Sequence, residues 1–499
     1  MKLGERFRFL LRGEYYFYLK ARMLPLLSEN ESMLLKKIAS GNYEEIDIRF
    51  TDILGYWRHV TLPAGQVTDS LLTRGVGFDG STMEAMTKTE AGDLAVVPDT
   101  RVVYEDPFAD RPTIFVLADI VHPDSGKSFS KDPRGVARRA DRFVKNSGIA
   151  AETFWAPEFE FYLFNKARFW SLPGRIGYEI DSAEAPWQSE FEESKGLVHT
   201  TSSGYDAMFP IDRLHKVRAE IARVMQKTGI QVKYHHHEVG RMGQVEVEVS
   251  FAPFLSTADS IMLTKHIIRN VALKNGLAST FMPKPLPGEP GSGLHFHIYF
   301  VSNGERVFYS KDGYYHLSDV ALNAIAGVLY HAPALCAFTN ASVNSYQRLV
   351  PKQEAPVYRF FSGPNRTAAI RVPAYAYSPE SMRFEYRVPD AAGNPYLCMA
   401  AILMGAADGI KRQLDPGRLG FGPIDENVFQ EDFDTSKLAT LPRSLDEALD
   451  GLLHDRAFLE QEGVFPPDLI DEYVGAKRRE CAIFRGNPHP LEHKLYFGL

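Results

Sequence analysis

Four stretches of the sequence place acidic or histidine side chains two residues apart among apolar residues: 157–161, 245–249, 295–297 and 383–387. Residues i and i+2 of a β-strand point to one face, so each stretch would present charge on one side and apolar groups on the other. If the charged faces converge, they form a cavity rich in negative charge that only cations make tolerable. The pattern therefore predicts a metal-dependent enzyme.

The candidate ligands of this metal site are mostly carboxylates. A single alternating acidic pair usually marks the wet face of an antiparallel sheet, and a histidine triplet such as 235–237 usually packs in the core or on the surface. The recurrence of the pattern in apolar stretches favours a metal site instead. Oxygen donors without thiolates favour Mg²⁺ or Mn²⁺ over zinc. The predicted ligands are Glu158, Glu160, Glu238, Glu246, His295 and Glu385.

Five arginines follow this acidic set along the chain, among prolines and aromatic residues. Guanidinium groups bind carboxylates and phosphates through paired hydrogen bonds, whereas any single arginine could simply form a surface salt bridge. Beside a metal-type acidic cluster, the group indicates phosphoryl transfer. The glycine-rich segment 288–297 is not a P-loop, because no Gly-Lys-Ser/Thr follows. The arginines are Arg348, Arg366, Arg371, Arg383 and Arg387.

Composition narrows the class of protein. The 499 residues are 44% hydrophobic and 24% charged, as in ordinary globular proteins, and the net charge of −7 argues against general nucleic-acid binding. Three widely spaced cysteines give neither a disulfide framework nor a zinc-binding spacing, which favours a reducing cytoplasm. The apolar runs fall short of the roughly 20 residues of a membrane-spanning helix, so we expect no membrane association.

Three regions are expected along the chain: an extension at 1–40, a small β-rich domain at 41–133 and a catalytic domain at 134–499. Strand patterns at 46–63, 94–97 and 113–119 define the β-rich domain. The larger region mixes strands and helices without strict alternation, which predicts an α+β fold with an antiparallel sheet lining the site.

Local signals predict the helices of the larger region. Asp212 is expected to cap one that stops at Gly229, and Ser444 with Glu447 has the spacing of a capping box that opens a helix through Leu459. Further helices are predicted at 134–146, 257–274, 318–330 and 396–411, and strands at 154–164 and within 230–251.

Ordered segments from position 50 to position 490 resemble glutamine synthetase of the type I class. They include Phe78-Asp-Gly-Ser-Thr82, Pro157-Glu-Phe-Glu160, His236-His-Glu238, Gly291-Ser-Gly-Leu-His-Phe-His297, Asn344-Ser-Tyr-Gln-Arg-Leu-Val-Pro351 and Asn365-Arg-Thr-Ala-Ala-Ile-Arg371. The resemblance implies a β-grasp-like N-terminal domain and a dodecamer of two hexameric rings, with active sites between neighbouring subunits. It also implies ATP-dependent ligation of L-glutamate with ammonia to L-glutamine, through a γ-glutamyl phosphate.

The resemblance also assigns roles to residues. Glu160, Glu238 and Glu246 would hold one Mg²⁺ or Mn²⁺ ion, and Glu158, His295 and Glu385 a second ion nearer the ATP phosphates. Arg348 would bind the glutamate carboxylate, Arg366 and Arg371 the phosphates, and Arg387 glutamate or the acyl phosphate. The remaining implied residues are the ammonium-binding acid Asp79, the flap residue Glu354, and Gly291, His297 and Arg383 around the substrate.

Four positions depart from the family pattern. Val198 replaces an aromatic residue of the ammonium pocket, Pro290 replaces an asparagine beside glutamate, and Thr82 replaces a common serine. Phe429 stands where adenylylated relatives have tyrosine, so we expect that form of regulation to be absent. Two alternatives therefore stay open: a γ-glutamyl ligase that uses a larger amine such as a polyamine, and a non-catalytic structural or regulatory homologue.

Overall fold

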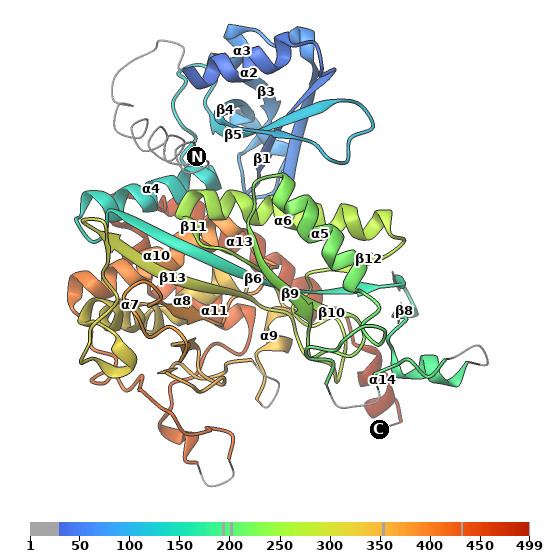
Figure 1. Ribbon diagram of the computed structural model, residues 1–499, viewed down its shortest axis with the longest axis vertical. Coiled ribbons are helices and arrows are strands. Elements are labelled where there is room, and N and C mark those ends of the chain that lie inside the picture. The colour runs from blue at the N-terminus through green and yellow to red at the C-terminus, as the bar shows by residue number, and fades with distance from the viewer. Residues whose placement is uncertain (1–28, 192–194, 200–202, 352–354, 431–432, 499) are drawn as a thin grey trace, which may run out of the picture.

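The computed structural model describes residues 29–191, 195–199, 203–351, 355–430 and 433–498. A small N-terminal domain stands on a larger one (Figure 1). Its five-stranded sheet has the order β2-β1-β5-β4-β3, in which β1 and β5 are parallel and the other neighbours antiparallel. The strands are β1 (Glu45–Thr51), β2 (Trp57–Pro63), β3 (Val76–Asp79), β4 (Asp93–Glu105) and β5 (Thr113–Val121), with helices α2 (Glu29–Ala39) and α3 (Asp69–Arg74).

Apolar residues at every second position of β1 anchor this small sheet to the hydrophobic core. Ile46, Ile48 and Phe50 are buried and point to one face, where they join the hydrophobic core. Leu34 of α2 is also fully buried in that core. The expected β-rich unit thus includes a helix from the segment predicted as an N-terminal extension.

The larger domain is built on a ten-stranded sheet whose main path is β15-β16-β17-β13-β6-β10-β9. Three short strands lie off this path: β11 and β12 pair with β6, and β14 pairs with β13. The bounds are β6 (Glu152–Phe164), β9 (Val232–His237), β10 (Gln244–Val249), β11 (Ala252–Pro253), β12 (Ala278–Thr280), β13 (Leu294–Ser302), β14 (Glu305–Arg306), β15 (Phe361–Ser362), β16 (Ile370–Arg371) and β17 (Phe384–Tyr386).

Helices pack against this sheet and against one another. Among the described residues the longest helix is α6, and the almost wholly buried α10 forms the centre of the helical layer. The bounds are α4 (Pro133–Asn146), α5 (His215–Lys227), α6 (Phe254–Lys274), α7 (Asp319–Tyr330), α8 (Ala332–Thr339), α9 (Ser345–Arg348), α10 (Pro395–Arg412), α11 (Leu445–His454), α12 (Ala457–Glu460), α13 (Pro467–Arg485) and α14 (Pro490–Tyr496). The mixed sheets and helices confirm the expected α+β class.

A buried ion network at the start of α4 joins the two domains. The Arg134 guanidinium donates to Asp259 of α6 at 2.8 and 2.9 Å, and to Asp99 of β4 and Asp119 of β5 at 2.9 Å each. Arg134 is only 4% exposed, so these three carboxylates compensate the cost of burying its positive charge.

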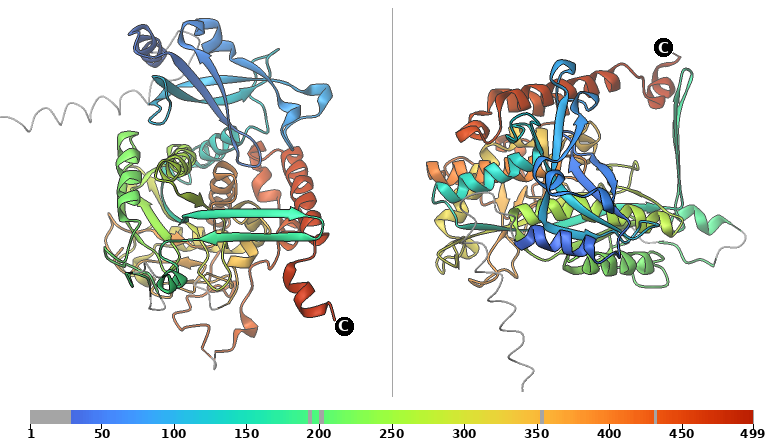
Figure 2. Two further views of the ribbon diagram at one scale, coloured as in Figure 1. Left: turned by 90° about the vertical axis from the view of Figure 1, so that its right-hand side faces the viewer. Right: turned by 90° about the horizontal axis from the view of Figure 1, so that it is seen from above.

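A long hairpin, β7 (Lys166–Leu172) and β8 (Arg175–Asp181), projects from the larger domain (Figure 2). Phe169 on this hairpin is 89% exposed and Leu172 is 59% exposed. Exposed apolar groups on a projecting element are typical of contact surfaces.

Two helix predictions were wrong in detail. Helix α5 begins at His215 with Leu214 at its N-cap, because the Asp212 carboxylate forms a buried ion pair with Arg218 and accepts a hydrogen bond from the Leu214 N–H. The helix opened by Ser444 ends at His454, and a separate short helix carries Leu459. The Glu447 carboxylate accepts from the Arg443 N–H instead of the Ser444 N–H, so the capping box is incomplete.

Within the described ranges, no single helix is both long and apolar enough to span a membrane. Helices α7 and α8 together have a suitable length and composition, but they meet at a bend of 74°.

Candidate active site

Strands β13, β6 and β10 bring the acidic and histidine positions together by their pairing register. Glu160 of β6 lies directly opposite Glu246 of β10. Glu158 of β6 lies opposite Glu248 on one side and His295 of β13 on the other. One polar row thus joins β6 and β10, and the other crosses β13, β6 and β10. The charged faces that the sequence analysis identified lie on neighbouring strands.

All members of these rows except Glu248 line a cavity of about 1240 Å³. All six residues predicted as metal ligands are among its lining residues, and so are four of the five predicted arginines and Gly291. The set is Glu158, Glu160, Glu238, Glu246, His295, Glu385, Arg348, Arg366, Arg371 and Arg387.

One potential metal-binding group consists of Glu158, His295 and Glu385, whose ligand atoms lie within 4.8 Å of one another. His295 Nδ1 is 3.1 Å from Glu158 Oε2 and 3.9 Å from Glu385 Oε1, and it is also 3.7 Å from Glu160 Oε1. A single imidazole nitrogen thus faces three carboxylates. The group of Glu158, His295 and Glu385 is the set that the resemblance assigns to the second ion.

A second potential group consists of His236, Glu238 and Glu246, also within 4.8 Å. His236 Nε2 lies 3.4 Å from Glu246 Oε1. Glu160, predicted as the third ligand here, lies outside this group, and its Oε2 accepts a hydrogen bond of 2.6 Å from the Gly293 N–H. The sequence analysis did not include His236 among the ligands, although it lies on β9 only two residues before Glu238, which follows the end of that strand.

The electrostatics of these carboxylates fit a site for divalent cations. Burial, with the nearby carboxylates of Glu158, Glu238 and Glu160, raises the pKa of Glu246 well above its ordinary value. Like charges directly opposite each other on paired strands are destabilising. Divalent cations bound by these oxygens would remove the penalty, and the carboxylate-rich donor set matches Mg²⁺ or Mn²⁺.

Imidazoles and arginines compensate the remaining acids. Burial acts to raise the pKa of Glu158, but His297 and His295 outweigh it and hold that pKa well below its ordinary value. Glu385 accepts from Arg371 at 2.6 Å and from Arg387 at 3.1 Å. Its pKa is lowered because His297 and these two arginines outweigh burial and the charge of Glu158.

Arg348 is held rigidly at the edge of the cavity. Its guanidinium donates to the carbonyl oxygens of Val388 and Arg387 at 2.8 and 3.1 Å, and to His295 Nε2 at 3.1 Å. A Cβ atom at Gly293 would lie 2.4 Å from that His295 nitrogen and 2.6 Å from Arg348 Nη2. Glycine at this position therefore allows the arginine and the histidine to approach the loop.

Other predicted residues lie outside the cavity lining. His297 is 1% exposed and its Nε2 lies 2.7 Å from Glu158 Oε1. It therefore contacts a cavity-lining residue without lining the cavity itself. Arg383 donates to the Ser381 carbonyl and lies over the rings of Phe251 and Tyr375. Glu354 falls outside the described residues.

Asp79 lies in the small domain, exposed at the end of the edge strand β3, and does not line the cavity of its own chain. Hydrogen bonds from the Ser81 hydroxyl at 2.7 Å and the Ser81 N–H at 2.9 Å lower its pKa. Its carboxylate is therefore ionised at neutral pH and available to a cation.

Comparison with known proteins agrees with this architecture. Family models described as "Glutamine synthetase, beta-Grasp domain" and "Glutamine synthetase, catalytic domain" match residues 42–123 and 130–496. The "Glutamine synthetase" of Streptomyces coelicolor is 40% identical over 472 residues, which cover 94% of this chain and 99% of that protein. The "3-hydroxylaminophenol mutase" of Cupriavidus pinatubonensis is 37% identical over 481 residues, 95% of this chain and 100% of the other.

Among solved structures, glutamine synthetase of Plasmodium falciparum superposes with a TM-score of 0.85 at 28% identity, over 95% of this chain and 100% of that one. A β-grasp domain followed by a catalytic domain with a carboxylate-lined sheet defines a class of two-domain ligases. The chain belongs to the glutamine synthetase family.

Proposed function

We propose that this protein joins L-glutamate to ammonia at the expense of ATP and releases L-glutamine, ADP and phosphate. The observation that carries the proposal is the convergence of the six predicted metal ligands and four arginines on one cavity. A non-catalytic homologue would have no use for so many buried carboxylates, which are costly without cations.

Mg²⁺ or Mn²⁺ bound by the acidic groups would screen the phosphates of ATP and polarise the transferred phosphoryl group. His295, Glu158 and Glu385 are the ligands proposed for one ion, and Glu238 and Glu246, with Glu160 or His236, those for the other.

The chain's own residues would position the reactants. We assign the glutamate carboxylate to Arg348, whose positive charge is fixed at the edge of the cavity by its hydrogen bonds, and the ATP phosphates to Arg366 and Arg371. A side-chain carboxylate oxygen of glutamate attacks the γ-phosphorus of ATP and ADP leaves. Ammonia then attacks the acyl carbon of the resulting γ-glutamyl phosphate, and phosphate leaves with that oxygen.

We propose that Asp79 binds ammonium and accepts its proton, and that a neighbouring subunit supplies it, because it is remote from its own chain's cavity. The projecting β7–β8 hairpin with exposed Phe169 supports assembly into a larger oligomer, which we propose to be two stacked hexameric rings. Three buried, unpaired cysteines agree with a cytoplasmic location.

A larger amine is the second candidate acceptor. Pro290 lines the cavity where the family resemblance expects an asparagine, and the buried Val198 has neither a hydroxyl nor a ring to offer ammonium. The glutamate-side and metal-side residues serve either acceptor equally well.

An ADP-release assay with mass spectrometric identification of the product tests the proposal. With glutamate, ATP and Mg²⁺, we expect ADP to form when ammonium is added and the product to be glutamine. The panel should include methylamine, ethanolamine and putrescine. Turnover with one of these and none with ammonium would establish the alternative acceptor, and no ADP release under any condition would favour the non-catalytic homologue.

A further inference from the structure

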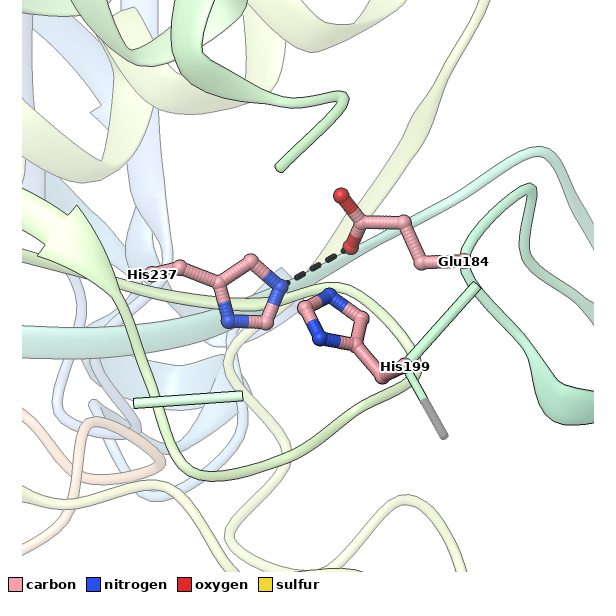
Figure 3. A group of neighbouring side chains, drawn as sticks. All are labelled: Glu184, His199 and His237. Carbon is pink, nitrogen blue, oxygen red and sulfur yellow. Dashed lines mark hydrogen bonds and ion pairs between the residues drawn. The ribbon is translucent and has the colours of Figure 1, made fainter. Parts of the chain in front are cut away.

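Glu184, His199 and His237 form a second polar cluster beside the active-site sheet (Figure 3). His237 follows His236 on β9, so its side chain points to the opposite face of the strand from the cavity-lining His236. Glu184 lies just after β8, and His199 lies on the segment 195–199 that also carries Val198. Three separate parts of the chain thus meet at this cluster.

The cluster is compact and almost completely removed from solvent. His237, Glu184 and His199 are 0%, 1% and 4% exposed. His237 Nε2 lies 3.0 Å from Glu184 Oε2, the two imidazole ring centres are 4.5 Å apart, and one ligand atom from each residue lies within 4.8 Å of the others. Tetrahedral zinc with bonds of about 2.0–2.1 Å would separate its ligand atoms by about 3.4 Å, which these side chains can reach with small rotations.

The hydrogen bonds around the cluster orient its potential metal-ligand atoms towards one another. His237 Nδ1 lies 2.7 Å from the Glu238 carbonyl oxygen, so this nitrogen carries the proton and donates it. In a neutral ring, Nε2 then presents a lone pair directly to the Glu184 carboxylate, which is repulsive unless a cation lies between them. The other carboxylate oxygen, Glu184 Oε1, is fixed by the Arg213 N–H at 2.7 Å.

The environment of His199 favours a bound metal ion over a proton shared between His237 and Glu184. Its Nε2 is buried and has no hydrogen-bond partner among the described residues. A proton shared by His237 and Glu184 would leave this nitrogen unsatisfied, at a cost typical of buried polar groups. A metal ion bound by all three residues would satisfy it.

We propose that Glu184, His199 and His237 form a binding site for a divalent transition metal, most suitably Zn²⁺, separate from the catalytic cavity. Two imidazole nitrogens and one carboxylate oxygen are a donor set that zinc uses in proteins. The His237–carbonyl and Glu184–amide hydrogen bonds supply the outer contacts that orient such ligands. The ion would fasten the segment with Val198 to β9, directly before the active-site residue Glu238.

Zinc retention by the full-length oligomer tests this site. The protein is dialysed with limiting Zn²⁺ and a large excess of Mg²⁺, which competes for the catalytic carboxylates, and bound zinc is counted by mass spectrometry. We expect about one zinc ion per chain in wild type, and its loss in His199→Asn and Glu184→Gln. His235→Asn is the matched control, because His235 lies on β9 but packs against His215 outside the cluster.

A readout on wild type alone guards against variants that do not fold. With Mg²⁺ present, Co²⁺ in place of zinc should give the strong visible absorption of a four- or five-coordinate ion. Failure of wild type to retain zinc and to give this absorption would overturn the proposal, as would zinc retention in His199→Asn equal to that of wild type. Activity with glutamate and ammonium enters none of these measurements.

Discussion

Glu160 and Glu246 lie directly opposite each other on the paired strands β6 and β10, and both line the same cavity. A sheet does not gain stability from opposed carboxylates, so this pairing has a stability cost that a bound cation would remove. The raised pKa of Glu246 reports the same conflict, with burial as its largest cause.

Replacing Glu246 with glutamine should relieve this repulsion and impair metal binding at the same time. We expect the affinity for Mn²⁺, measured by titration calorimetry, to fall at least about 10- to 100-fold, and turnover to fall with it. Without metal, the variant should unfold at the same temperature as wild type or higher, because it removes a like-charge contact.

Glu152→Gln is the control for this variant, since Glu152 starts the neighbouring strand β6 but does not line the cavity. It should leave Mn²⁺ affinity unchanged. Unaltered Mn²⁺ affinity in Glu246→Gln would argue against Glu246 as a ligand.

Arg348→Lys should impair use of glutamate specifically. Lysine keeps the charge but cannot reproduce the fork that spans the Val388 and Arg387 carbonyls and His295. We expect kcat/KM for glutamate to fall about 100-fold while the KM for ATP changes little. Arg359→Lys changes a partly buried arginine outside the cavity and should behave as wild type. An equal rise in both KM values would contradict the assignment of Arg348 to glutamate.

Mixed oligomers test whether Asp79 acts across a subunit boundary. Asp79→Asn and Glu246→Gln subunits should each be inactive alone, yet co-expressed oligomers should regain activity, because some interfaces combine an intact residue from each. With random mixing, about a quarter of such interfaces are complete. If Asp79 served its own chain, every site would lack one residue and the mixture would stay inactive.

His266 of α6 should make stability sensitive to acid. Its ring lies against Trp57 and Phe108 of the small domain, at 5.5 and 5.7 Å between ring centres. Burial, with the nearby Arg49, lowers its pKa to about 4 from 6.5. Between pH 6.5 and 4 the histidine of the unfolded chain binds a proton more readily than that of the folded chain. The free energy of unfolding is therefore unaffected by this group above pH 6.5 and decreases as the pH falls towards 4, by up to about 3 kcal/mol.

Urea denaturation at several pH values measures this loss. His266→Gln should flatten the dependence between pH 6.5 and 4, whereas His122→Gln, which alters an exposed histidine, should not. A dependence unchanged in His266→Gln would assign the acid sensitivity to other groups.

Periodicity in the sequence predicted the strands of the site well, because alternating charge and apolar groups is a local property of each strand. The register that sets Glu158 between His295 and Glu248 depends on pairing across distant segments, and local periodicity carries no information on it. Asp212 was assigned to a cap because Arg218, its buried partner, cannot be identified from spacing alone. The cluster of Glu184, His199 and His237 was missed for the same reason, since its members come from three separate parts of the chain.

The most direct test of the proposed reaction follows an oxygen atom. Glutamate labelled with ¹⁸O in its γ-carboxylate is incubated with the protein, ATP, Mg²⁺ and ammonium, and the released phosphate is analysed by mass spectrometry. The proposed γ-glutamyl phosphate predicts one labelled oxygen in each phosphate formed together with glutamine. Phosphate released without label, while glutamine or another amide accumulates, would contradict the account.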